Sequence, residues 1–119
     1  MIHHAGVEVS DRERSAGFYD AVVGPLGWRR LVDEPDRIGW GIVRPVFFIS
    51  TRGPVVSGGS YVCFAARTIP AVRDAWEGGI AAGGSDDGAP GVQYGGTNFA
   101  AYLRDPDGHR VEVAVSTDQ

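Results

Sequence analysis

The alternation of apolar and polar side chains predicts that the chain opens with a strand. From Ile2 to Val9 apolar residues recur at every second position, which places Val7 on a buried face. His4, Gly6 and Glu8 then share the opposite face, because successive side chains of a strand point to opposite sides. This second face is free to carry polar chemistry.

A helix is expected next, from about Asp11 to Val23. Ser10 and Glu13 have the spacing of a capping box, in which two side chains satisfy unpaired amides at a helix start. Four apolar side chains at helical spacing form its expected buried stripe: Phe18, Tyr19, Val22 and Val23. Gly and Pro end the helix at residues 24–27. Three strands are expected to follow, at Trp28–Val32, Ile38–Val43 and Val46–Thr51.

The same order of elements begins again after residues 53–59, which are rich in Gly, Pro and Ser. A strand is expected at Tyr61–Ala66, and Thr68 is placed to cap a second helix. Residues 85–91, rich in Gly and Asp, are expected to form a loop. Short strand material should follow it at residues 92–94.

The last predicted element is a hairpin, with strands at Asn98–Arg104 and Arg110–Ser116. The Asp105-Pro-Asp-Gly108 segment between them is typical of a tight turn. Strand, helix and three strands therefore occur twice, and aligning His4 with Tyr61 supports an internal duplication. We expect one α+β domain over residues 1–119, with modules at 1–53 and 58–119.

The amino-acid composition excludes some classes of function but does not identify one. The chain has 119 residues, 43% hydrophobic and 22% charged, as in an ordinary globular domain. Its net charge is −4, which argues against a nucleic-acid or anionic-membrane surface. All 11 basic residues are Arg, so lysine-based covalent chemistry is excluded. One cysteine permits no internal disulfide, and a cytoplasmic location is the default expectation because no leader or 18-residue apolar run is seen.

Glu112 is the most informative charged residue, because it lies on the final strand opposite a row of valines. Its carboxylate either faces solvent, paired with Arg104 or Arg110, or lines a cavity. His4 is similarly open to two interpretations: a structural histidine bonded to Glu112, or a cleft residue. His109, beside the turn, is expected to be exposed.

These motifs resemble the vicinal oxygen chelate superfamily, which includes glyoxalase I, bleomycin-resistance proteins and extradiol dioxygenases. The resemblance rests on His4-Ala-Gly-Val-Glu-Val-Ser-Asp11 with Phe18-Tyr19, on Ser60-Tyr-Val-Cys-Phe64, and on Asp105-Pro-Asp-Gly108 with Glu112. It covers essentially the whole chain and is closest to a small glyoxalase-like subgroup. The family fold consists of two βαβββ modules that form a half-open mixed sheet around a cleft, with helices on the outer face. The usual assembly is a homodimer.

The resemblance implies a small-molecule cleft and, in some members, a divalent metal. His4 and Glu112 stand at two metal-ligand positions, and Tyr61 occupies a third, where many members have a second His. In the metal-dependent interpretation, Glu112 or Glu8 moves a proton in a lyase, isomerase or dioxygenase reaction. One imidazole and one carboxylate hold an ion poorly, since a catalytic site needs about three protein ligands.

Two alternatives therefore stand beside a metal enzyme. One is a metal-free protein that binds or sequesters a drug or metabolite, and the other is a module whose cleft is packed interior. Either cleft interpretation places His4, Tyr61 and Glu112 together. The side chains expected to bind substrate at the cleft wall are Tyr61, Trp40, Phe48, Tyr94 and Tyr102.

Overall fold

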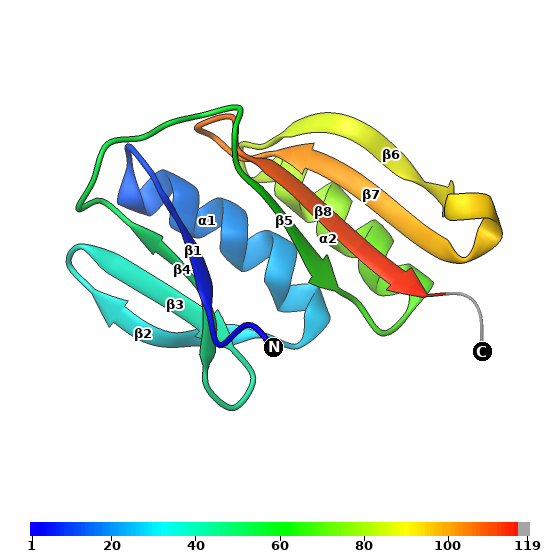
Figure 1. Ribbon diagram of the computed structural model, residues 1–119, viewed down its shortest axis with the longest axis horizontal. Coiled ribbons are helices and arrows are strands. Elements are labelled where there is room, and N and C mark those ends of the chain that lie inside the picture. The colour runs from blue at the N-terminus through cyan, green and yellow to red at the C-terminus, as the bar shows by residue number, and fades with distance from the viewer. Residues whose placement is uncertain (117–119) are drawn as a thin grey trace.

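The computed structural model describes residues 1–116, apart from the side chain of Tyr94. Within this range the chain forms two four-stranded sheets and two α-helices (Figure 1). Two short 3-10 helices lie at Gly24–Leu26 and Tyr94–Gly96. The strands and α-helices are, in chain order, β1 (Ala5–Glu8), α1 (Arg12–Val23), β2 (Arg29–Glu34), β3 (Arg37–Gly41), β4 (Pro45–Ser50), β5 (Tyr61–Ala65), α2 (Ile69–Ala81), β6 (Ser85–Gln93), β7 (Asn98–Arg104) and β8 (Arg110–Ser116).

The two sheets have the same topology. The first has the strand order β1-β4-β3-β2 and the second β5-β8-β7-β6, and in each the opening strand runs parallel to the last one. All other neighbouring strands are antiparallel. This repeat confirms the α+β fold class with two βαβββ modules. In the described part of the chain, no helix is long and apolar enough to span a bilayer.

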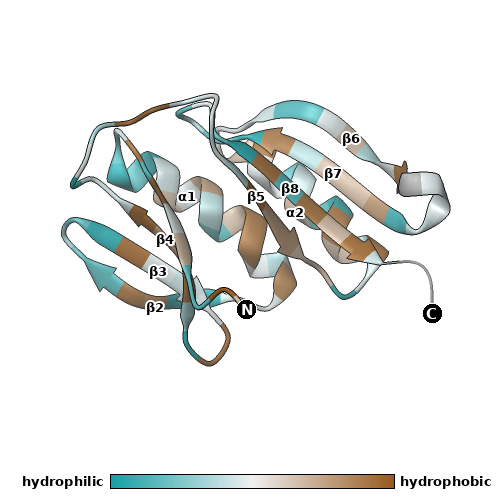
Figure 2. Ribbon diagram, in the orientation of Figure 1, coloured by the Kyte–Doolittle hydropathy of each residue, from teal (hydrophilic) through white to brown (hydrophobic). Residues whose placement is uncertain are grey.

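Both helices cover one face of the sheets, and a single core joins the modules. The rings of Phe47 on β4 and Phe64 on β5 are perpendicular, with centroids 5.0 Å apart. Tyr19 of α1 lies 4.9 Å from Phe47, measured between ring centroids. Bands of different hydropathy along β8 in Figure 2 reflect the alternation that sends Val111 and Val113 into this core. The opposite faces of both sheets are left without a helix.

The start of α1 differs from the expected capping box. Asp11 is the N-cap, and its carboxylate accepts a hydrogen bond from the Arg14 amide at 3.2 Å. Glu13 instead forms an ion pair with Arg12. Ser10 is drawn away because its amide and hydroxyl both donate to Asp107, at 3.0 and 2.5 Å. Asp11 therefore caps the helix in place of Ser10, which a tertiary contact holds.

The start of α2 agrees with the prediction. The hydroxyl of Thr68 accepts a hydrogen bond from the Ala71 amide at 3.2 Å. The segment after this helix does not agree, because residues 85–91 belong to the nine-residue strand β6 and are not a loop. β6 is an edge strand with two register shifts against β7. Backbone pairing with β7 therefore overrides the low strand propensity of Gly and Asp.

The turn between β7 and β8 docks on the first module. Its backbone closes with a hydrogen bond from the Gly108 amide to the Asp105 carbonyl, at 2.9 Å, and Gly108 has φ +89°. The buried Asp105 carboxylate accepts the Tyr19 hydroxyl at 2.7 Å. It also accepts the amides of Asp107 and His109, both at 2.9 Å. One carboxylate thus organises the turn and fixes it to α1.

His109 is part of the same contact and is not solvent-exposed as expected, since only 3% of its surface is accessible. Its Nε2 lies 2.8 Å from the carbonyl oxygen of Glu8, and its Nδ1 lies 2.8 Å from the hydroxyl of Ser60. A carbonyl only accepts hydrogen bonds, so Nε2 carries a proton. The side chain therefore connects the end of β1 to the second module.

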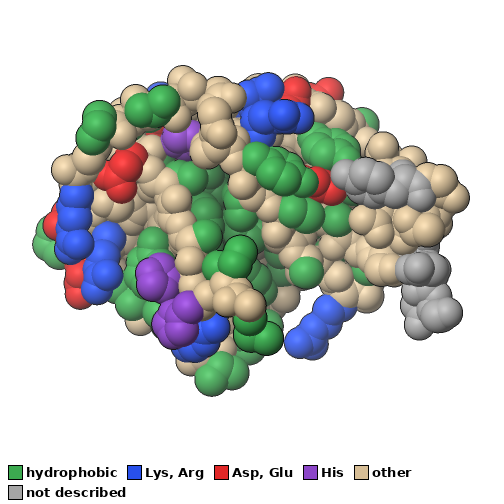
Figure 3. Space-filling model, viewed as in Figure 1, with side chains coloured by type: hydrophobic (Ala, Val, Ile, Leu, Met, Phe, Trp, Pro, Cys, Tyr) green, Lys and Arg blue, Asp and Glu red, His purple; other side chains and the backbone are tan. Residues whose placement is uncertain are grey.

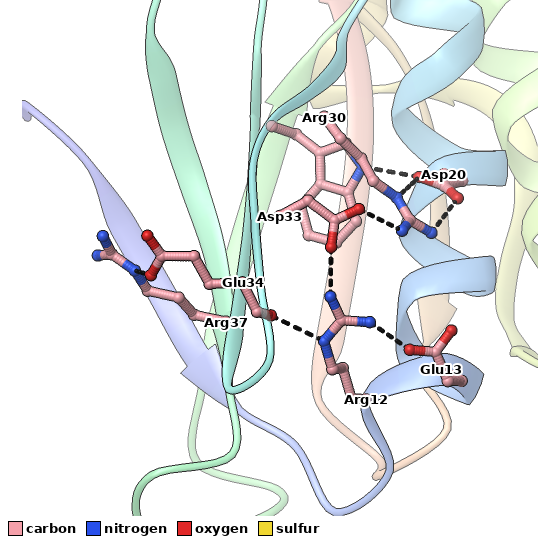
Figure 4. Close-up of polar contacts among 8 residues, drawn as sticks. Arg12, Glu13, Asp20, Arg30, Asp33, Glu34 and Arg37 are labelled. Carbon is pink, nitrogen blue, oxygen red and sulfur yellow. Dashed lines mark hydrogen bonds and ion pairs between the residues drawn. The ribbon is translucent and has the colours of Figure 1, made fainter.

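A network of arginines and carboxylates attaches β2 and β3 to α1 (Figure 4). Arg30 donates to both oxygens of Asp20, at 3.0 and 2.7 Å, and also pairs with Asp33 at 3.1 Å. The indole N–H of Trp40 donates to Asp20 at 2.9 Å. Arg12 pairs with the other oxygen of Asp33. Partial burial opposes ionisation of Asp20, but hydrogen bonds from Arg30 and Trp40 hold the pKa of its carboxyl below the usual value.

Tyr19→Phe is expected to lower the free energy of unfolding by about 1–3 kcal/mol, because it leaves a buried carboxylate without one of its donors. Urea denaturation of both proteins measures this difference. Burial, and then the neighbouring charge of Asp105, raise the pKa of the Tyr19 hydroxyl well above 10, so it stays a donor at all working pH values. In a double-mutant cycle with Asp105→Asn, the two losses should not add. An unchanged midpoint for Tyr19→Phe would contradict this role.

Arg30→Gln is expected to be most destabilising near neutral pH. The folded-state pKa of Asp20 lies below its unfolded value of about 3.9, so its contribution is present above that pH and is lost as pH falls through the folded pKa. The difference in melting temperature between wild type and variant should therefore shrink from pH 6 to pH 3. Arg29→Gln, at an exposed position of the same strand, is the matched control and should show no such trend. A gap that widens in acid would oppose this assignment.

Candidate functional site

Two hollows lie on the helix-free faces of the sheets. The first-sheet hollow has a volume of about 480 Å³ and the second-sheet hollow about 410 Å³. Figure 3 shows this side of the molecule, where histidine and arginine side chains lie over and at the edge of the first module. The first-sheet hollow is lined by His3, His4, Ala5, Gly6, Val7, Glu8, Arg37, Arg44, Pro45, Phe48, Ser50 and Arg52. The second-sheet hollow is lined by Tyr61, Asp87, Tyr102, Arg110 and Glu112.

The first-sheet hollow exists because two glycines flank one aromatic ring. Gly6 on β1 and Gly39 on β3 are the register partners of Phe48 on β4, so the three form one row across the sheet. A Cβ atom on Gly39 would lie 2.6 Å from the Phe48 ring, which shows that the ring covers this position. Because neither flanking residue has a side chain, nothing projects beside the Phe48 ring, and the floor of the hollow is apolar.

Glu8 lies on the next row of this face, beside Ser50 and Arg37. Its carboxylate accepts the Gly53 amide and, at 3.2 Å, the Ser50 hydroxyl. These hydrogen bonds tie the end of β1 to the segment after β4. The position of Glu8 on the face of His4 is as predicted, while its side chain serves to hold the wall of the hollow in place.

His4 stands at the opposite end of the first-sheet hollow and is exposed. Its ring meets Phe48 edge to face, with centroids 5.5 Å apart. One of its ring nitrogens lies 2.9 Å from a ring nitrogen of His3. The two imidazoles form a polar pair just before the start of β1.

Glu112 lines the second-sheet hollow and is only 2% exposed. The Tyr61 hydroxyl donates a hydrogen bond to its carboxylate. Cys63 on β5 and Tyr102 on β7 are its register partners, so Glu112 lies between a thiol and a second phenol. Arg104 and Arg110 both approach Asp87 instead, at 3.2 and 3.8 Å. Glu112 is thus a buried carboxylate stabilised by a phenol and not a surface ion pair.

The predicted site residues are divided between the two hollows. Tyr61 and Glu112 lie together, but His4 lines the other hollow, so one chain does not bring these three groups together. Phe48 lines the first hollow and Tyr102 the second. Trp40 is not a wall residue: it is fully buried on the helix-covered face and bonded to Asp20. The side chain of Tyr94 lies outside the described residues.

The donors of a single chain do not fit a divalent metal. A catalytic site needs about three protein ligands around one point. In residues 1–116, no three His, Cys, Asp or Glu side chains are grouped closely enough to hold an ion. His4 is paired with His3, and Glu112 with Tyr61. Neither hollow therefore offers a ready set of ligands.

Sequence reasoning missed the arginines of the first-sheet hollow. Arg37 and Gly39 are two residues apart on β3 and therefore share the helix-free face. The alternation of side chains around Ile38 could thus have predicted the orientation of Arg37. Arg44 and Arg52 lie outside the strands, after β3 and after β4, where alternation gives no direction. Their positions depend on the path of the chain beyond the sheet.

Cys63 is expected to be an unreactive thiol although the residue is exposed. Burial of its sulfur, and then the negative charge of Glu112, raise its pKa to about 12. At pH 8 its thiolate fraction should be lower than that of a free cysteine by a factor of about a hundred or more. Alkylation by iodoacetamide, followed by mass spectrometry, measures this rate. Glu112→Gln should accelerate it, and the urea-unfolded protein should react like free cysteine. A folded wild type that reacts equally fast would contradict this.

Comparison with known proteins agrees with this architecture. The sequence matches the Glyoxalase/Bleomycin resistance protein/Dioxygenase superfamily over residues 1–113. The solved structure of a glyoxalase/bleomycin resistance protein from Albidiferax ferrireducens is 34% identical, with a TM-score of 0.85 over 95% of this chain and 96% of that one.

Two further solved structures share the fold at lower identity. A glyoxalase-related enzyme from Fulvimarina pelagi is 23% identical, with a TM-score of 0.74 over 95% of this chain and 86% of that one. Lactoylglutathione lyase from Agrobacterium tumefaciens is 18% identical, with a TM-score of 0.67 over 94% and 91%. Comparison with curated proteins gave no match. The match over nearly the whole sequence shows that this chain belongs to the glyoxalase/bleomycin resistance protein/dioxygenase superfamily.

Proposed function

We propose that the protein binds a small organic molecule in the first-sheet hollow and does so without a metal ion. The observation that carries this proposal is the Gly6–Phe48–Gly39 row, which leaves an apolar floor under a hollow of about 480 Å³. Ligand sites commonly have volumes of about 300–1,000 Å³ and combine apolar walls with a few polar groups. Phe48 supplies the apolar floor, and the arginines and histidines supply the polar groups.

The alternative, a metal-dependent lyase, isomerase or dioxygenase, has less support in the side chains. His4 and Glu112 line different hollows of the chain, and the carboxylate of Glu8 already accepts two hydrogen bonds. Binding by shape and aromatic contact requires none of these groups to move. The donor set therefore favours a binding protein over a metal enzyme.

We also propose that two copies associate as a homodimer. Exposed apolar side chains next in sequence to residues that line the first-sheet hollow support a protein contact: Ile2, before His3, is 77% exposed, and Val43, before Arg44, is 92% exposed. Both hollows are open, and each is built from one module alone. A second copy would cover apolar surface that is costly to leave in water.

Isothermal titration calorimetry with 2-naphthamide and 2-naphthoate tests the binding proposal. At least one probe should bind saturably with one site per chain, equally well before and after treatment with EDTA. Gly39→Ala should weaken binding about tenfold or more, because its Cβ pushes the Phe48 ring into the hollow. Gly17→Ala, where a Cβ meets nothing within 4 Å, is the matched control.

Binding that disappears with EDTA, or that Gly39→Ala leaves unchanged, would overturn the proposal. Light scattering on the same samples measures the assembly. A mass of twice 12.6 kDa supports the homodimer, and a mass of 12.6 kDa opposes it.

A further inference from the structure

The first-sheet hollow is lined by more cationic than anionic groups. Arg37, Arg44 and Arg52 line it, against the single carboxylate of Glu8. The chain as a whole carries a net charge of −4, so this excess is local and opposite in sign to the whole molecule. A preference for anions in this hollow would therefore come from nearby side chains and not from the overall field.

Two of these arginines are already compensated. The Nε of Arg37 lies 2.8 Å from the Glu34 carboxylate, and its guanidinium carbon lies 5.4 Å from the Phe48 ring centroid. Arg52 pairs with both oxygens of Asp36, at 2.7 and 3.2 Å. These ion pairs occupy donors and reduce the attraction of either guanidinium for a ligand.

Arg44 is different, because a backbone carbonyl and not a carboxylate holds it. One of its Nη atoms donates to the carbonyl oxygen of His3. Across residues 1–116, no carboxylate lies within ion-pair distance of Arg44. The contact with His3 places the guanidinium at the end of the hollow where the imidazoles of His3 and His4 also lie. Its charge is fixed in position and not neutralised by a neighbour.

The carboxylate of Glu8 lies at the other end of the same face. Glu8 is paired across the sheet with Ser50, two residues along from the Gly6–Phe48 pair. Its hydrogen bonds to Ser50 and Gly53 hold it there. An anion beside Arg44 would therefore be separated from this negative charge by the apolar floor of Gly6 and Phe48.

We propose that the first-sheet hollow selects a small organic anion, with an apolar planar body against Gly6 and Phe48 and a carboxylate on Arg44. This inference rests on the proposed binding function and adds the charge of the ligand. A carboxylate suits Arg44 because a guanidinium presents parallel N–H donors that match two carboxylate oxygens. Arg44 is then the residue that determines specificity, while Phe48 provides affinity for any flat apolar molecule.

Calorimetry with 2-naphthoate and 2-naphthamide separates these two contributions, since the probes share a ring system and differ in charge. Wild type should bind 2-naphthoate about tenfold or more tightly than 2-naphthamide, which is the effect of one charge-assisted hydrogen bond. Arg44→Gln should weaken binding of 2-naphthoate far more than binding of 2-naphthamide, and so remove this preference. Arg44→Lys keeps the charge and should retain part of the preference. Arg29→Gln, on the same sheet outside the hollow, should behave like wild type.

The outcomes distinguish the two proposals. Equal binding of both probes by wild type, or a preference that survives in Arg44→Gln, would overturn the assignment of Arg44 and leave the hollow as a small-molecule site. Failure of both probes to bind would overturn the proposed function itself. Circular dichroism of each variant verifies that the fold is retained.

Discussion

The docking of the β7–β8 turn on the first module fixes the relation between the two halves of the molecule. β1 and β5 belong to separate sheets, so within residues 1–116 no ladder of backbone hydrogen bonds joins the modules. Asp105 and His109 supply that connection, through Tyr19 of α1 and the carbonyl of Glu8. Tyr19, Asp105 and His109 are buried and hydrogen-bonded, and Glu8 is partly buried, which makes the contact specific in geometry as well as favourable. The packing of α1 on α2 adds a second contact between the modules.

This joint also determines how polar chemistry is distributed. His109 binds the backbone carbonyl of Glu8 at the end of β1, and Glu112 lies three residues beyond His109 on β8, so this connection joins the two strands that carry these carboxylates. The joint leaves them in separate hollows: one basic and aromatic, the other containing a buried acid between phenols. A duplicated fold has thus produced two faces of different chemical character. The difference arises from a few open-face positions, since the strand order is the same in both halves.

Sequence reasoning recovered the fold because the core residues follow simple periods. The hairpin Asn98–Arg104 and Arg110–Ser116 has the expected bounds, since its turn chemistry and its alternation agree. The errors occur where tertiary contacts override local signals. Ser10 binds Asp107 and does not cap the helix. Residues 85–91 pair with β7 as a strand although they are rich in Gly and Asp.

The site was harder to predict than the fold. Alternation correctly placed His4 and Glu8 on one face and Glu112 opposite the buried valines. It gave no measure of the distance between the two sheets, so it could not show that His4 and Glu112 line different hollows. Trp40 was misplaced because an aromatic residue on a strand serves a wall or a core equally well by pattern alone. The bond from its indole to Asp20 settles that position.

The outer strands of both sheets bear on how copies of this chain meet. β6 contains Asp86, Asp87 and Pro90 and loses register with β7 twice, and β2 carries Arg29, Arg30, Asp33 and Glu34. Charge, proline and irregular pairing make such edges poor templates for strand addition by another molecule. These two edges therefore disfavour edge-to-edge polymerisation, and the proposed homodimer would form through other surfaces of the molecule.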